Sequence, residues 1–137
     1  MIPLIIIAGP TAIGKSDVAF ELAKRLNTKI ISADSIQVYR HFDIGTAKPS
    51  LERQKEIQHH LIDIVNPDED FSAGEFNEKA YEIAEGLNRQ GKIPIVSGGT
   101  GLYIRALLDN LGCGVKKKQG IREKIKSEFK EMGRGNV

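Results

Sequence analysis

The stretch Gly-Pro-Thr-Ala-Ile-Gly-Lys-Ser, residues 9–16, decides the fold of this 137-residue chain. It matches the pattern G-x-x-x-x-G-K-[ST] of a phosphate-binding P-loop. An apolar run of strand length, Ile2 to Ala8, precedes it, and apolar residues at helical spacing follow it up to Asn27. A strand before the pattern and a helix after it are the context that makes the match specific. We therefore predict a loop that grips the diphosphate or triphosphate end of a small molecule.

Each part of this loop has a physical role in binding phosphate. Glycines let the backbone turn its N–H groups toward oxyanions, and the helix that follows contributes the positive end of its dipole. Lys15 supplies a mobile cation, and the Ser16 hydroxyl is the candidate ligand of a Mg²⁺ ion that also takes phosphate oxygens and water. The expected diphosphate-binding residues are Gly9, Pro10, Thr11, Ala12, Ile13, Gly14, Lys15 and Ser16. Nucleotide hydrolases, small-molecule kinases and diphosphate-transfer enzymes all remain possible from this motif alone.

The remaining pattern alternates strands with helices. Strands are predicted over Lys29–Ala33, His60–Val65 and Ile93–Val96, and the first strand, Ile2–Ala8, is expected to be central because it is apolar throughout. Helices are predicted near residues 51–57, from an N-cap at Ser72 to Gly91, and over residues 102–108. Such alternation predicts an α/β fold with a parallel sheet and helices on both faces, and ligands bound at the carboxyl ends of the strands.

Composition narrows the class of protein. The chain is 40% hydrophobic and 28% charged, values of an ordinary globular domain and not of a disordered or fibrous one. Its longest apolar run is far shorter than the ~20 residues that cross a bilayer, so we expect no membrane partner and a cytoplasmic location. The single cysteine, Cys113, excludes an internal disulfide and is expected to be inert.

Positive charge is concentrated near the carboxyl end. Residues 112–137 hold eight Lys or Arg and three Glu, a net +5, which leaves 12 basic and 15 acidic residues in the rest of the chain, a net −3. This basic segment could approach a polyanion, or it could be the solvated face of an amphipathic helix.

Two further polar junctions follow predicted strands. Asp34 comes directly after the second strand, which we expect to lie beside the P-loop strand, and its carboxylate could be a general base, a metal ligand or a helix cap. The glycine-rich segment Ser97–Tyr103 follows the fourth strand and either admits a substrate close to the backbone or forms a tight turn. His59 and His60 resemble a metal pair only superficially, because adjacent residues of a strand point to opposite faces, and we expect structural roles for them.

Five blocks of sequence, taken together, resemble the tRNA dimethylallyltransferase (tRNA isopentenyltransferase) family over residues 4 to about 108. They are GPTAIGKS at 9–16, ISADSIQVYR at 31–40, DIGTAKP at 43–49, HHLID at 59–63 and GGTGLY at 98–103. The resemblance implies transfer of a dimethylallyl group from dimethylallyl diphosphate to N6 of the adenosine beside the anticodon of tRNA, with release of diphosphate. It also implies that the P-loop holds the isoprenoid's diphosphate, although the motif is usually associated with ATP and other nucleotides.

The resemblance carries roles over to particular positions. Lys15, Asp34 and Thr100 are expected to be catalytic, with Asp34 as the base. Mg²⁺ on Ser16 is the expected cofactor. The expected tRNA-binding residues are Asp34, Ser35, Ile36, Gln37 and Thr100. We expect the protein to act as a monomer.

Family members continue well beyond the length of this chain. Residues 1–111 are therefore expected to be an incomplete P-loop α/β core, and residues 112–137 the truncated beginning of a basic helical insertion. Its apolar stripe, Ile121, Ile125, Phe129 and Met132, would lack a partner, and such a fragment need not be active alone. The alternatives are a P-loop small-molecule kinase, which would need an Arg-rich lid that we do not find, and a non-catalytic tRNA-binding fragment.

Overall fold

A four-stranded parallel sheet forms the centre of the molecule. The structure is a computed structural model, and it describes residues 3–9, 14–41 and 48–111. The strands are β1 (Ile5–Ala8), β2 (Ile30–Ser32), β3 (His59–His60) and β4 (Ile95–Gly98), arranged in the order β1-β4-β2-β3. The expected α/β fold with a parallel sheet is confirmed.

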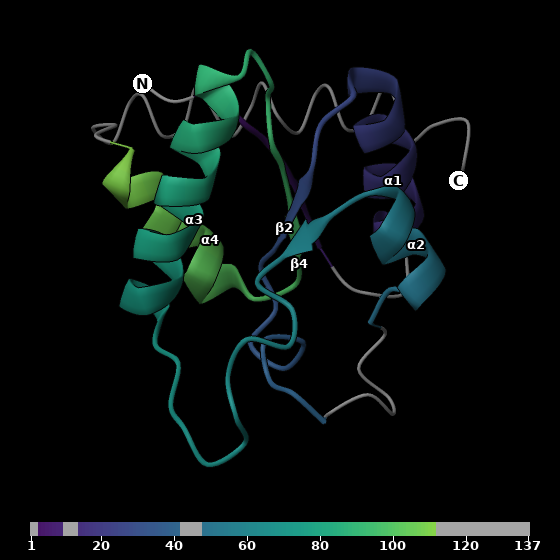
Figure 1. Ribbon diagram of the computed structural model, residues 1–137. Helices are drawn as coiled ribbons and strands as arrows, with labels where there is room; N and C mark the ends of the chain where they lie inside the picture. The colour runs from purple at the N-terminus through teal and green to yellow at the C-terminus, as the bar shows by residue number, and fades with distance from the viewer. Residues whose placement is uncertain (1–2, 10–13, 42–47, 112–137) are drawn as a thin grey trace.

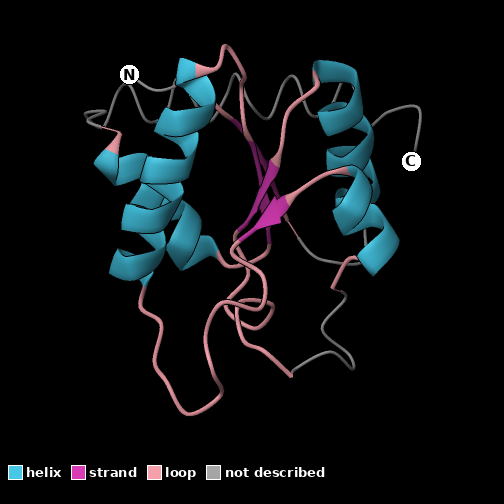
Figure 2. Cartoon of the chain, viewed as in Figure 1, coloured by secondary structure: helices cyan, strands magenta, loops and turns pink. Residues whose placement is uncertain are grey.

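Helices cover both faces of this sheet (Figure 1). On one side lie α1 (Lys15–Leu26) and α2 (Leu51–Glu56), and on the other side lie α3 (Ala73–Arg89) and α4 (Gly101–Asn110). Figure 2 shows the same three layers, with the long loop before α3 projecting beyond the ends of the strands. Each of the four helices appears close to the range predicted for it from the sequence.

Local signals in the sequence set the ends of the long helices. The Ser72 side chain caps α3 by accepting a hydrogen bond from the backbone N–H of Glu75 at 3.1 Å, as the spacing of the two residues predicted. Asn27 ends α1 in the left-handed conformation with φ of 50°, and Gly91 adopts φ of 77° just after α3. Asparagine and glycine are the residues that enter this conformation most easily.

Two apolar cores hold the layers together. Between the sheet and the pair α3 and α4, the ring of Tyr103 stacks on Phe76 at 4.6 Å between centroids and meets Phe71 edge-on at 6.2 Å. Its hydroxyl donates to the Phe71 carbonyl at 3.2 Å, so the buried phenol is satisfied. Between the sheet and α1, Val18 and Leu22 pack on the strands. These cores fix α1 and α4 to the sheet and thereby fix the positions of Lys15 and Gly101 at the first turns of the two helices.

The order of the strands corrects one expectation. Ile2–Ala8 was expected to be central and the β2 strand to lie beside it, but among the described strands β1 is at one edge, and β4 lies between β1 and β2. Ile95 of β4 aligns with Ile5 on one side and with Ile30 on the other. The apolar pattern of β1 reflects burial on both faces, since Ile6 packs in the core with α3 and α4 and Ile7 in the core with α1, and it does not specify the neighbours of β1 in the sheet.

The third strand is also shorter than expected. A strand was predicted over His60–Val65, but the regular pairing with β2 covers His59–His60 alone. Leu61 and Asp63 then take positive φ values of 67° and 57°, which turn the chain out of the strand, and Val65 returns to make an isolated bridge to Tyr39.

Several expectations lie outside the described residues. They concern Pro10–Ile13 of the P-loop, the segment 42–47, and all of residues 112–137, including the division into a core and an insertion, Cys113 and the apolar stripe. Within the described ranges, every helix is too short or too polar to cross a bilayer.

Candidate functional site

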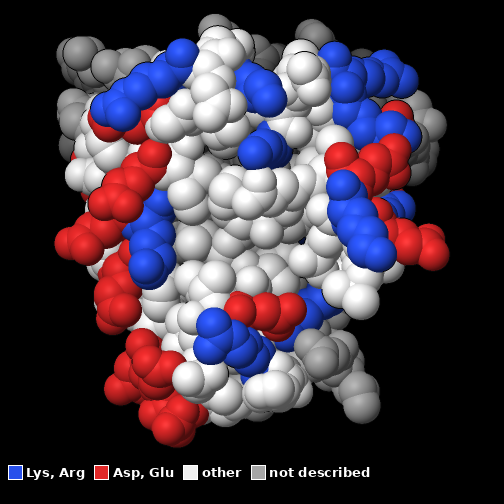
Figure 3. All heavy atoms as spheres, viewed as in Figure 1, with Lys and Arg blue, Asp and Glu red and all other residues white. Residues whose placement is uncertain are grey.

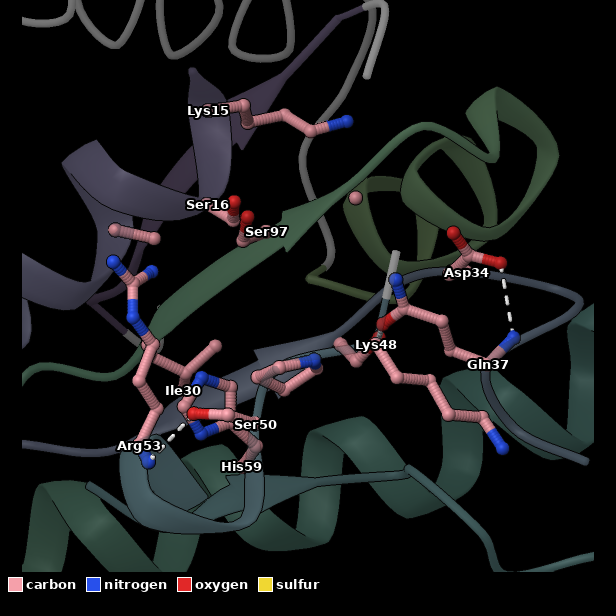
Figure 4. A pocket seen from close by; sticks show the side chains of 14 residues that line it. Lys15, Ser16, Ile30, Asp34, Gln37, Lys48, Ser50, Arg53, His59 and Ser97 are labelled. Atoms are coloured by element: carbon pink, nitrogen blue, oxygen red, sulfur yellow. Dashed lines mark hydrogen bonds between the residues drawn. The ribbon is translucent and has the colours of Figure 1, made fainter. Parts of the chain in front are cut away.

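A cavity of about 280 Å³ opens at the carboxyl end of the sheet, where the parallel fold predicted a ligand site (Figure 4). Its walls come from the start of α1, the ends of β2 and β4, the turn after β2, and the segment from Lys48 to Arg53, with His59 on the floor. Lys15, Ser16, Asp34 and Gln37 all line it. Residues of two separate predicted sites therefore share one cavity.

Lys15 is held at the first position of α1 with 5% of its surface exposed. Its ammonium donates a hydrogen bond of 2.7 Å to the carbonyl of Gly9 at the start of the P-loop. Burial lowers the pKa of Lys15, and the charge of Asp34 opposes this shift. A buried cation with one carbonyl partner gains from an incoming anion, which is the behaviour expected of a phosphate-binding lysine.

Ser16 follows in the first turn of α1, is exposed, and lines the cavity beside Lys15. A hydroxyl at a helix amino end suits Mg²⁺ that arrives with a diphosphate, because this ion keeps several waters and takes few protein ligands. The described residues contain no cluster of three or more His, Cys, Asp or Glu side chains that could hold a metal unaided. The Ser16 hydroxyl therefore fits the role of a single protein ligand to an ion that also takes substrate oxygens and water.

Asp34 organises the turn that follows β2. Its Oδ1 accepts hydrogen bonds from the backbone N–H groups of Ile36 at 2.8 Å and Gln37 at 3.1 Å. The sequence left a helix cap open as an alternative, but residues 35–38 form a turn and not a helix, so the carboxylate caps a turn. Oδ2 takes part in neither bond, so capping leaves one oxygen of the carboxylate for other chemistry. Ile36, in the same turn, is 52% exposed.

Gln37 brings an amide into the cavity. Its Oε1 accepts a hydrogen bond from the Ser32 hydroxyl at 3.2 Å, which orients the side chain. Figure 4 shows its amide directed to the middle of the site, between Asp34 and Lys48.

Thr100 ties this turn to the junction between β4 and α4. Its Oγ1 accepts from the backbone N–H of Ser35 at 2.9 Å, and its own N–H donates to the Ala33 carbonyl at 3.1 Å. The structure therefore brings Thr100 to the Asp34–Gln37 turn, as expected for one site, but its side chain is not part of the cavity wall. The hydroxyl is positioned beside the turn and is already bonded to it.

The glycines after β4 allow three segments to converge. A Cβ on Gly98 would lie 2.1 Å from the carbonyl oxygen of Ala33, and a Cβ on Gly99 would lie 3.4 Å from the Lys15 ammonium. At Gly98 the backbone that approaches closely is the protein's own β2, and at Gly99 the missing side chain leaves room for Lys15. From the sequence, the glycines were expected either to admit a substrate close to the backbone or to form a tight turn. The structure shows a further role for Gly98, which is close packing of the ends of β4 and β2.

Some residues of the cavity were not predicted to take part in binding or catalysis. Lys48 and His59 lie in blocks that carried the family resemblance, and Ser97 begins the glycine-rich junction. The sequence therefore singled out the segments that contain these residues, although it gave the residues themselves no part in binding. Arg53 had no such signal: it reaches the cavity from α2, where its guanidinium pairs with Asp17 at 2.7 Å.

His59 is a neutral part of the floor. Its Nδ1 lies 2.8 Å from the carbonyl of Ile57, and burial lowers its pKa, an effect that the Ile57 carbonyl opposes and that Arg53 reinforces. An uncharged imidazole at neutral pH does not compete with Lys15 as an anion ligand. His59 and His60 pair in register with Ile30 and Ile31 of β2 as a two-residue strand, and that they form no metal pair stays a prediction.

Known proteins resemble this chain over most of its length. At 60% identity over 131 residues, it matches the tRNA dimethylallyltransferase of Alkaliphilus oremlandii, covering 95% of this chain and 42% of that protein. The crystal structure of the full-length tRNA isopentenylpyrophosphate transferase of Bacillus halodurans superimposes with a TM-score of 0.77 at 45% identity, covering 83% of this chain and 38% of that one. A eukaryotic dimethylallyltransferase, described as acting on tRNA, gives a TM-score of 0.73 at 37% identity, covering 78% and 27%.

The chain spans 39–44% of the length of the curated relatives that it matches. The family model described as IPP transferase matches residues 37–137, which is most of the chain. The match includes the Gln37 side of the cavity, and the P-loop, residues 9–16, precedes the matched range. By this match and by the agreement of its fold, the chain belongs to the IPP transferase family.

Proposed function

We propose that the protein transfers a dimethylallyl group from dimethylallyl diphosphate to N6 of the adenosine adjacent to the anticodon in tRNA. In this reaction the bond from C1 of the allyl group to the diphosphate oxygen breaks, and a bond from C1 to N6 forms. N6 loses one proton, and diphosphate leaves. The observation that carries the proposal is that the P-loop residues Lys15 and Ser16 line the same cavity as Asp34 and Gln37.

The P-loop end of the cavity suits the leaving group. Lys15 is buried and cationic, and exchange of its Gly9 carbonyl partner for a diphosphate oxygen would strengthen its hydrogen bonding. The amino end of α1 adds a positive dipole at Ser16. Mg²⁺ held by Ser16 and the diphosphate would neutralise charge that develops as the carbon–oxygen bond breaks. Single groups that stabilise such charge typically contribute ~2.7–4 kcal/mol.

The turn after β2 suits the nucleophile. The N6 amine of adenine is weakly nucleophilic because its lone pair is delocalised into the ring, and it must lose a proton as it is alkylated. The Asp34 carboxylate would accept that proton and stabilise the transient positive charge on nitrogen. Gln37 offers an amide of the kind that pairs with the N6 and N7 edge of adenine. Thr100, bonded to Ser35, would hold the turn and contact the RNA at its edge.

The base must leave its stack to enter this cavity. Turning out one nucleotide costs a few kcal/mol, and an anticodon loop is a single-stranded target where this cost is low. On the face in Figure 3, acidic side chains gather along α3 and the loop before it, where Asp68, Glu69, Glu75 and Glu78 are exposed. The tRNA backbone should avoid that face, since both carry negative charge. We place the reaction in the cytoplasm and expect the protein to act as a monomer.

A direct assay tests this function. The protein expressed from its complete open reading frame should transfer radiolabel from dimethylallyl diphosphate to tRNA, and a tRNA with guanosine in place of the target adenosine should remain unlabelled. Isothermal titration separates the alternatives: tight binding of ATP with none of dimethylallyl diphosphate would indicate a small-molecule kinase. Binding of tRNA with no transfer by the complete protein would indicate a non-catalytic RNA-binding protein.

A further inference from the structure

The turn that carries Asp34 and Gln37 lies against a second segment, residues 61–66, which we call the support segment. Backbone bonds join the two in a short ladder. Asp63 N–H donates to the Gln37 carbonyl at 3.1 Å, Ile64 N–H to the Val38 carbonyl at 2.9 Å, and Arg40 N–H to the Val65 carbonyl at 2.8 Å. This is the region where a strand was expected and a turned segment is found. Because Asp63 donates to the Gln37 carbonyl, the support segment fixes where the Gln37 backbone lies relative to the cavity.

Lys48 connects the two segments from the side. Its ammonium donates to the carbonyl of Tyr39 at 2.8 Å and pairs with Asp63 Oδ1 at 2.5 Å. In Figure 4 its ammonium points away from Lys15 and Ser16. Lys48 therefore lines the cavity with its methylene stem, while its charge is engaged outside the phosphate end of the cavity.

Burial makes this contact unusual for a lysine. The Lys48 side chain is 7% exposed, while that of Asp63 is 43% exposed. Removing an ammonium from water is costly, and an apolar residue in place of a buried ion pair is often neutral or better for stability. The presence of a lysine at this place is thus better explained by its holding Tyr39 and Asp63 in one relative orientation than by a gain in stability.

We propose that Lys48 is a positioning residue that, through Tyr39 and Asp63, holds the Asp34–Gln37 turn in the orientation that receives the target base of tRNA. This inference rests on the proposed function. It separates two roles within one cavity: Lys15 acts on the diphosphate, and Lys48 acts on the RNA-binding turn without touching either substrate through its charge.

The test uses Lys48→Met, which keeps the methylene stem and removes the ammonium, in the protein from the complete open reading frame. We expect KM for tRNA to rise about tenfold or more, because hydrogen bonds to charged groups contribute enough for about a 10- to 100-fold effect. Affinity for dimethylallyl diphosphate should stay within about twofold. The amides of Arg40 and Ile64, which form the ladder, should exchange hydrogen faster.

Lys24→Met is the matched control. It removes an ammonium from the outer surface, where Lys24 pairs with Glu56 at 3.3 Å, and should change neither tRNA KM nor exchange in the ladder. Asp63→Asn is a milder second variant, because its side chain is half-exposed, and should shift tRNA KM in the same direction. Lys48→Met combined with Asp63→Asn should be no worse than Lys48→Met alone if the pair acts as one unit.

The outcomes are distinct. Faster exchange in the ladder with unchanged tRNA KM would overturn the positioning role and leave Lys48 as a structural contact. An equal loss of affinity for dimethylallyl diphosphate would overturn the separation from the phosphate site. Failure of the proposed function would be seen earlier, as a lack of transfer by the unmodified protein, and it would remove the inference with it.

Discussion

Replacement of Asp34 by asparagine separates its two roles, capping and catalysis. In the structure, Oδ1 accepts from Ile36 N–H at 2.8 Å and from Gln37 N–H at 3.1 Å. The asparagine side chain keeps an oxygen in that place, so both hydrogen bonds and the turn should persist. The variant loses the negative charge and the capacity to accept a proton from N6. Asp34→Ala, in contrast, also loses the cap.

The expected magnitudes follow from these contacts. Loss of a general base typically slows turnover by ~10²–10⁴-fold, or ~3–5 kcal/mol of activation free energy. The free energy of unfolding should hardly change in Asp34→Asn, while Asp34→Ala should lose ~1 kcal/mol, the usual cost of removing a side-chain cap. Turnover should therefore fall in both Asp34→Asn and Asp34→Ala, whereas the free energy of unfolding should fall in Asp34→Ala alone.

Asp34 also acts on its neighbour Lys15. Its charge raises the pKa of Lys15 against the lowering effect of burial, so Asp34→Asn should lower that pKa further. A lysine with a lower pKa loses its proton at lower pH. As the pH is raised, diphosphate binding should weaken in both proteins when Lys15 loses its proton. This weakening should begin at a lower pH in Asp34→Asn than in the unmodified protein, and binding near pH 7 should change little.

Single-turnover transfer of radiolabelled dimethylallyl to tRNA measures the catalytic effect, and titration calorimetry with diphosphate between pH 7 and pH 10 measures the effect on Lys15. Thermal unfolding of the three proteins completes the comparison. The reasoning fails if Asp34→Asn turns over at a near-normal rate while its melting temperature falls. Asp34 would then be a structural cap, and the base would have to be another residue.

The other predictions concern the phosphate loop, the strand ends and a helix cap. Lys15→Ala should slow transfer by orders of magnitude and leave tRNA binding nearly unchanged in a filter-binding assay, because this ammonium lies at the P-loop. Gly98→Ala should lower the free energy of unfolding by about 3 kcal/mol or more in denaturant titration, since its Cβ would collide with the Ala33 backbone, whereas Gly86→Ala, in open space within α3, should stabilise by ~0.5–1 kcal/mol. Ser72→Ala should cost ~1 kcal/mol of stability by removing the cap of α3, and an unchanged melting temperature would contradict this.

Local chemistry explains why much of the molecule is predictable from the sequence. The P-loop pattern, the capping box at Ser72, the stop at Asn27 and the 3.6-residue periodicity of the helices all depend on residues close together in the chain. Interactions of this range are written directly into residue order. They are sufficient for the element types, the α/β class and the location of Lys15 and Ser16 at the start of a helix.

Contacts between distant segments explain what could not be predicted. The position of β4 between β1 and β2 depends on which strands fit side by side, and apolar runs such as Ile2–Ala8 are alike in this respect. β3 ends at His60 because the support segment turns there to form hydrogen bonds with residues 37–40. The role of the Lys48 charge can be recognised only in the folded chain, where Tyr39 and Asp63 lie beside it. Hydrophobic patterning specifies which side of an element is buried, and packing of the whole chain selects the partner that buries it.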